Sequence, residues 1–121
     1  MWITTTAGFL SVVQNLDSIG PGDAILVRGR VRPDLEHFAD FVARHGGRPV
    51  VTETPLLDYG YRLTTSREMF ASYLTEQVGA LNYPNFKNEV AETDPRRARI
   101  YARVWEVLRD LRKLGAKETR G

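Results

Sequence analysis

Apolar and polar residues alternate along much of the first third of the chain, the pattern of β-strands that bury one face. Residues 2–6 and 9–14 are rich in β-forming residues and flank Ala7-Gly8, which predicts a hairpin. Residues 15–23 contain Gly20-Pro21-Gly22 and predict a loop.

Residues 24–32 alternate most regularly. One face of the predicted strand carries Ile25, Val27, Gly29 and Val31. The opposite face carries Leu26 and three arginines, Arg28, Arg30 and Arg32. The pattern predicts a half-buried strand with an arginine row on its open side.

The apolar spacing changes to three and four residues after Pro33, which predicts a helix that Gly46-Gly47 ends. Its apolar stripe is Leu35, Phe38, Phe41 and Val42. Two short strands, 50–54 and 59–64, follow around a turn at 55–58. Arg62 lies on the face opposite Tyr61 and Leu63, which places it beside the arginine row.

Residues 65–68, Thr-Ser-Arg-Glu, have the spacing of a capping box and open a second helix. Its predicted stripe is Phe70, Tyr73, Leu74, Gln77, Val78 and Leu81.

A corner between helices follows at Tyr83-Pro84-Asn85-Phe86-Lys87. Pro84 disfavours a helical Tyr83, and Asn85 can cap the next helix by accepting from the amide of Lys87 or Asn88. Phe86 is expected to pack inward, and this account of the corner leaves only Lys87 unexplained. The two rings either lock the corner into the core or face a partner.

A short helix to about residue 92 precedes Asp94, which caps a last helix opened by Pro95 and ended by Gly115. Its predicted buried stripe is Tyr101, Val104, Trp105, Leu108 and Leu111. The prediction is an α+β fold: a ββαββα-type antiparallel sheet with helices packed on one face and an extra C-terminal helix. Residues 1–115 form one compact domain, and 116–121 a flexible tail.

Composition indicates an ordinary globular domain, with 42% hydrophobic and 26% charged residues in a chain of 121. The chain has no cysteine, which excludes disulfides, thiolate zinc sites and a cysteine nucleophile. Its first residues lack the features of a signal peptide, and no apolar run approaches the roughly 20 residues of a membrane span. We therefore expect a cytoplasmic protein that does not enter membranes.

The net charge of +2 is unevenly distributed. From Pro95 onward there are nine basic and three acidic residues, so this segment carries +6 and the preceding residues together carry −4. A basic helix of this kind either meets a polyanion or an acidic protein surface, or is simply a solvated face.

Several elements together resemble a group of small bacterial and phage proteins of about this length, common in actinobacteria. They are Trp2-Ile3-x-Thr5, Gly8-Phe9-x-Ser11-Val12-Val13, the strand at 26–31, Asp58-Tyr59-x-Tyr61-Arg62, Tyr83-Pro84-Asn85-Phe86-Lys87, and Tyr101 with Trp105. The resemblance covers almost the whole chain, and the Tyr-Pro-Asn-Phe-Lys element is its most specific part. The resemblance implies a folded domain, and it implies no particular activity.

The arginine row is the first candidate site. Side chains at Arg28, Arg30 and Arg32 on one strand face would lie about 6.5–7 Å apart, close to the phosphate spacing of an extended nucleic-acid strand. Such a site also needs aromatic platforms on the same face, which Phe9 or Tyr59 would supply. The alternative is a structural role, with the arginines paired to Glu53 or Asp58 or covered by a helix.

Catalysis has less support. His37 and His45 are eight residues apart, too far for a zinc pair on one helix, and His45 suits a helix C-terminus. Asp58 and Glu53 near strand ends are the remaining candidates, for a metal-dependent hydrolase. No serine elbow and no phosphate-binding glycine motif occurs in the sequence.

The candidate interface residues are Trp2 at a sheet edge and Tyr101 and Trp105 on the last predicted helix. They would suit a homodimer. The sequence favours a small non-enzymatic adaptor or inhibitor that acts by protein–protein contact and uses no cofactor or metal. The alternative is a module that binds nucleic acid or a nucleotide through Arg28, Arg30, Arg32, Arg62 and Lys87.

Overall fold

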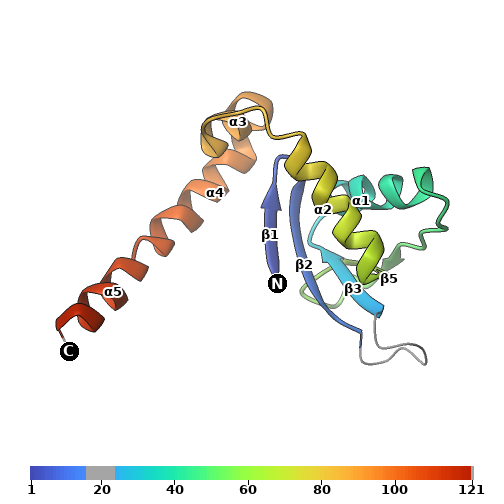
Figure 1. The fold of residues 1–121 in the computed structure, drawn as a ribbon, viewed down its shortest axis with the longest axis horizontal. Coiled ribbons are helices and arrows are strands. Elements are labelled where there is room, and N and C mark those ends of the chain that lie inside the picture. Colours follow the sequence, from blue (N-terminus) through green and yellow to red (C-terminus); the bar gives the residue numbers. More distant parts are fainter. Residues whose placement is uncertain (16–23, 121) are drawn as a thin grey trace. The chain divides into compact units, whose positions relative to one another are not determined.

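The computed structural model describes residues 1–15 and 24–120, and Figure 1 shows its elements along the chain. The chain divides into two compact units, Met1–Leu81 and Asn82–Gly121, where the sequence predicted one domain to residue 115. The division falls just before the corner at residues 83–87. Apart from Asn15, the loop expected at 15–23 lies outside the described residues.

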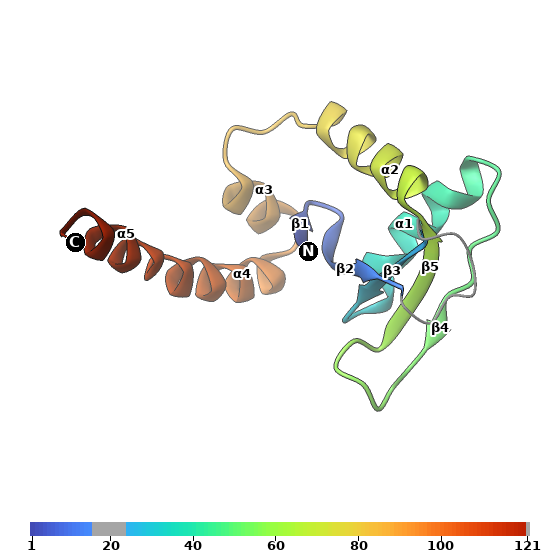
Figure 2. The ribbon, with the colours of Figure 1, turned by 60° about the horizontal axis from the view of Figure 1, so that its bottom comes forward.

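The first unit is a five-stranded antiparallel sheet in the order β1-β2-β3-β5-β4. The strands are β1 (Trp2–Thr5), β2 (Gly8–Gln14), β3 (Ala24–Gly29), β4 (Thr52–Glu53) and β5 (Tyr61–Ser66). Helices α1 (Arg32–Arg44) and α2 (Arg67–Gly79) cover one face of this sheet (Figure 2). The predicted α+β class, with helices on one face, is confirmed.

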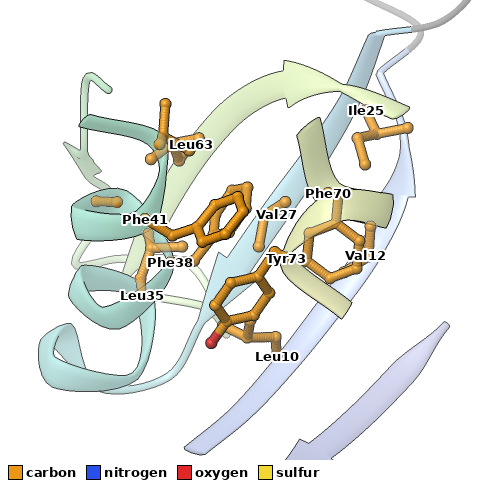
Figure 3. Close-up of a cluster of buried hydrophobic side chains, with 12 residues drawn as sticks. Leu10, Val12, Ile25, Val27, Leu35, Phe38, Phe41, Leu63, Phe70 and Tyr73 are labelled. Carbon is orange, nitrogen blue, oxygen red and sulfur yellow. The ribbon is translucent and has the colours of Figure 1, made fainter. Parts of the chain in front are cut away.

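The core lies between that sheet face and the two helices. Val12, Val27 and Leu63 are neighbours across β2, β3 and β5, because residues opposite each other in the ladder point to the same side. Phe38 from α1 and Phe70 from α2 pack over them, with ring centroids 5.2 Å apart (Figure 3). Each fully buried apolar side chain of this size contributes about 1.5–3 kcal/mol.

The turn between β1 and β2 is fixed by contact with α1. Gly8 has φ +137°, and a Cβ added there would lie 2.2 Å from Cγ of the buried Asp34. Oδ2 of Asp34 accepts a hydrogen bond from the amide of Phe9 at 2.9 Å. Only glycine leaves room for this contact.

Strand β3 is shorter than predicted. It ends at Gly29, and α1 begins at Arg32 with Pro33 in its first turn. Proline fixes the φ of a first helical turn, so the helix starts while the alternating pattern still continues. Val31, expected on the buried face, is the exposed residue before α1.

Helix α2 is capped one residue later than the capping-box spacing indicates. The hydroxyl of Ser66 accepts from the amide of Met69 at 3.1 Å. Phe70 and Tyr73 are buried as expected. The helix ends at Gly79, so Leu81 lies beyond it, and Val78 is exposed rather than part of a buried stripe.

The second unit contains α3 (Phe86–Thr93), α4 (Pro95–Leu108) and α5 (Leu111–Arg120). Both predicted caps are confirmed. Asn85 Oδ1 accepts from the amide of Asn88 at 3.0 Å, and Asp94 Oδ1 accepts from that of Arg97 at 3.1 Å. The predicted helix end at Gly115 is wrong, because α5 continues through it to Arg120. A glycine inside a helix costs only about 1 kcal/mol. A flexible tail at 116–121 stays a prediction.

The predicted buried stripe of the last helix is also wrong. The structure describes every residue of α4, and none of them is buried. Figure 1 shows α4 and α5 following each other end to end. The helices of this unit therefore expose most of their apolar side chains.

Candidate binding surfaces

A row of side chains crosses the sheet on the face away from α1 and α2. The ladder pairs Trp2 with Ser11, Ser11 with Arg28, Arg28 with Arg62, and Arg62 with Thr52. Directly opposed residues project to the same side, so these five side chains share the open face. The prediction that Arg62 lies beside Arg28 is confirmed.

Arg28 and Arg30 enclose the ring of Tyr59. Each guanidinium carbon lies 4.6 Å from the ring centroid. Arg28 Nη2 donates to the hydroxyl of Ser11 at 2.7 Å, and Arg30 Nη1 donates to the carbonyl of Asp58 at 3.2 Å. Nε of Arg28 is buried and has no hydrogen-bond partner among the described residues. Tyr59 is therefore held between two cations and offers no free stacking platform.

Arg32 lies outside the row. It is the first residue of α1, where it forms ion pairs with Glu36 and Glu53 and lies over the ring of Tyr61. Its pKa is raised above the usual value, first by the hydrogen bond to Glu53 and then by that to Glu36. The prediction that Arg28, Arg30 and Arg32 follow one another along one face of a single β-strand is therefore wrong.

Arg62 is also engaged within the fold. Its Nε donates to the hydroxyl of Thr54 at 3.3 Å, and Nη2 lies 4.0 Å from Oδ1 of Asp58. The same carboxylate oxygen accepts from the amide of Tyr59 at 3.0 Å and so shapes its own turn. Glu53 and Asp58 are thus partners of arginines, as the structural interpretation of the row expected.

An aromatic pair, the exposed Trp2 and the half-buried Phe9, occupies the other end of the open face. Trp2, in the edge strand β1, is 74% exposed, and its ring meets that of Phe9 edge-on with centroids 5.8 Å apart. Phe9 is opposite Thr4 and therefore on the same face as Trp2 and Arg28. The sequence could not place Phe9 on this face.

A shallow groove of about 530 Å³ adjoins the row beside β5. Leu26, Arg62, Thr64 and Thr52 line it from β3, β5 and β4, and Arg48 lines it from the segment before β4. Arg48 was not among the predicted residues, because nothing in its local sequence places it near Arg62.

The corner at residues 83–87 organises the second unit. The ring of Phe86 stacks on that of Tyr101 with centroids 6.0 Å apart, and Tyr83 packs against Phe86. Lys87 Nζ lies 3.7 Å from the ring centroid of Trp105, a cation–π contact that joins α3 to α4. Lys87, Tyr101 and Trp105 therefore have structural contacts within this unit.

Beside those contacts, α4 and α5 present an apolar stripe. Its side chains are 50% to 68% exposed. It consists of Ile100, Val104, Val107, Leu108, Leu111 and Leu114. Five of these recur alternately four and three residues apart, the spacing of a coiled-coil seam. This spacing was present in the sequence but was masked by the competing pattern through Tyr101 and Trp105.

The two candidate histidines both have partners within the fold. His37 Nδ1 and the Tyr73 hydroxyl lie 2.8 Å apart in a hydrogen bond, and His45 Nδ1 contacts the carbonyl oxygen of Phe41. In the described part of the chain, no three His, Asp or Glu side chains gather as metal ligands would.

Comparisons of the chain with protein-family models, curated proteins and solved structures found no match. Within residues 1–15 and 24–120, no helix is long and apolar enough to cross a membrane.

Proposed function

We propose that the protein is a non-enzymatic binding module, of adaptor or inhibitor type, that docks a helix of a partner protein on the apolar stripe. The observation that carries this proposal is the exposure of the stripe on helices with little packing of their own. Monomeric proteins rarely leave so continuous an apolar surface uncovered unless it is a contact surface.

The stability of α4 supports the same function. Helices shorter than about 12–15 residues are marginal in water and depend on burying an apolar face. Within α4 no side chain is buried, and α3 covers only the side that carries Tyr101 and Trp105. A helix laid along Val104 and Val107 would complete the missing packing.

Site-specific photo-cross-linking tests the proposal. A photoreactive side chain at Val107 should form a covalent adduct with a protein in the cells that make this chain. The matched control is Ala102, which is also exposed on α4 but lies on the opposite side of the helix from the stripe. No protein adduct from Val107, or equal adducts from both positions, would count against docking at the stripe.

A second candidate function is binding of single-stranded nucleic acid to the open sheet face. Trp2 and Phe9 share that face with Arg28 and Arg62, which is the combination of stacking and basic groups such a site uses. The internal contacts of the arginines weigh against it, because each is already held by a ring, a hydroxyl or a carboxylate.

Trp2→Ala tests the second candidate without disturbing the core, because the side chain is largely exposed. Loss of a base-stacking ring should weaken oligonucleotide binding about 5- to 100-fold. Binding should also fall steeply with salt and be lost in Arg28→Ala with Arg30→Ala. Oligonucleotide affinity that is unchanged in Trp2→Ala and in the double variant would remove this function.

A further inference from the structure

The apolar stripe has the sequence register of an antiparallel two-helix coiled coil. Its a positions are Val104 and Leu111, and its d positions are Ile100, Val107 and Leu114. We propose that the occupant of the stripe is a second copy of this chain, with α4 and α5 of the two copies running antiparallel. The proposal rests on the proposed function, since it names the partner that the stripe binds.

In this arrangement four apolar layers are symmetric about a two-fold axis near residues 105 and 106. Each a residue meets a d residue of the other copy, as antiparallel coiled coils require. Val104 packs on Val107 of the second copy, and Ile100 packs on Leu111 of the second copy, each pair occurring twice. Leu108, at an e position, is exposed beside the seam and widens its apolar area.

The charges beside the seam select this orientation. In an antiparallel pair, g positions face g positions, so Arg103 meets Asp110 of the second copy, twice by symmetry. In a parallel pair, g faces e, and Arg103 would meet Leu108 while Asp110 would meet Gly115. Only the antiparallel register gives both charges an opposite partner.

Among the residues that the structure describes, neither Arg103 nor Asp110 has a strong competing partner. Asp110 Oδ1 forms one exposed ion pair with Lys113, three residues away at 3.4 Å. Exposed pairs of this kind are worth little and would yield to a contact across a closed seam.

The junction between α4 and α5 keeps the stripe in phase. A strict seven-residue repeat lags a straight α-helix by about 20° per heptad, or about 40° over the two heptads from Ile100 to Leu114. The junction is wound more tightly: Arg109 has ψ −23°, and the amide of Asp110 donates to Val107 O, three residues back, at 3.0 Å. Two residues wound as tightly as a 3₁₀-helix would add about 20° each, which would offset the lag.

Sedimentation velocity of the full chain over about 5–500 µM tests the proposal, a range suited to a short, weak seam. We expect reversible dimerisation. Val107→Lys should abolish it, and the matched control Ala102→Lys, on the opposite side of α4, should retain it.

Charge reversal then tests the orientation. Arg103→Asp alone should weaken dimerisation at least tenfold, because like charges meet at both symmetric pairs. Combining it with Asp110→Arg should restore the dissociation constant to within about threefold of the parent. Far-UV circular dichroism checks that the variants remain helical.

A parent chain that stays monomeric throughout would overturn self-association. Cross-linking from Val107 to a different protein would still support docking of a partner helix on the stripe. The failure of self-association can therefore be distinguished from the failure of the proposed function. Dimerisation that is insensitive to Val107→Lys, or a double charge reversal no better than the single one, would overturn the antiparallel seam.

Discussion

Gly8 and Asp34 are in contact with no room for one more carbon atom between them. The carboxylate of Asp34 is buried and needs hydrogen-bond donors, and the amide of Phe9 supplies one. The positive φ of Gly8 directs this amide towards α1. A single residue without a Cβ thus joins the first hairpin to the first helix.

Gly8→Ala should therefore destabilise the first unit by about 2–4 kcal/mol, through strain at positive φ and overlap with Asp34. Urea denaturation would measure the loss. Gly79→Ala is the control: a Cβ there meets nothing within 4 Å, and the change should be neutral or slightly stabilising. Equal effects of the two substitutions would contradict this account of the turn.

Tyr73 makes the first unit sensitive to alkaline pH. Burial is the main cause that raises its pKa from 10 to about 12, and Glu76 and Asp34 add to it. Between pH 10 and pH 12 the unfolded chain loses this proton while the folded chain keeps it, so the free energy of unfolding falls as pH rises. The stabilisation is complete below pH 10, and its loss over this window is of the order of 2–3 kcal/mol.

Denaturation midpoints at pH 9 and pH 11.5 would measure this dependence. Tyr73→Phe should flatten it, at the cost of the hydrogen bond to His37. Tyr83→Phe, in the second unit, should leave the alkaline loss unchanged. A variant without Tyr73 that loses as much stability as the parent would show that other groups dominate.

At the level of elements, side-chain caps stabilise the first turns of α3 and α4. Asn85 and Asp94 each accept a hydrogen bond from the amide three residues further on. The pKa of Asp94 is lowered, first by the backbone amide of Arg97, so its contribution is present above its ordinary pKa and is lost as pH falls through the lowered value.

Asn85→Ala should destabilise α3 by about 1 kcal/mol, because the amide of Asn88 loses its partner. The helical signal of the 82–121 region in circular dichroism should then melt at a lower temperature. Asn85→Asp preserves an acceptor oxygen and should behave like the parent. If Asn85→Ala melts at the parent temperature, the cap is not what positions α3.

Caps and strict alternation could be predicted from the sequence because they depend on neighbouring residues. Asn85, Asp94 and the buried Val27 were predicted correctly for this reason. Arg32 was assigned to the strand because alternation continued by coincidence into the first turn of α1. Sequence spacing alone could not detect that helix start, where Pro33 outweighs the pattern.

The candidate surfaces depend on contacts that are distant in sequence. Tyr59 lies between Arg28 and Arg30, roughly thirty residues away from them, and no local pattern reveals that pairing. The sequence of α4 contains two overlapping apolar stripes, and spacing alone does not indicate which of them α3 covers. The structure assigns Tyr101 and Trp105 to α3 and leaves Val104 and Val107 exposed.

At the scale of the whole molecule, the two units differ in how they are stabilised. The core cluster, with residues such as Val27, Phe38 and Tyr73, lies entirely within Met1–Leu81. In the described part of the second unit, only Val90 is buried. The first unit is therefore stabilised by its own core, and the described part of the second buries little apolar side-chain surface.

A fragment of residues 1–81 should unfold cooperatively, with a stability close to that of the same unit in the full chain. A fragment of residues 82–121 should be partly helical when dilute and gain helicity as its concentration rises, because association buries the stripe. Circular dichroism over a hundredfold concentration range would measure both. Concentration-independent helicity in the second fragment, or an unfolded first fragment, would contradict this division.

The contact between Gly8 and Asp34 has a consequence for how this sequence can vary during evolution. The two positions are 26 residues apart, yet a larger residue at position 8 becomes acceptable only after the side chain at position 34 has shrunk or moved away. Neither change is favourable first, since one creates overlap and the other leaves the amide of Phe9 without its acceptor. Descendants of this chain should keep both residues or replace both, and those that keep only one should be rare.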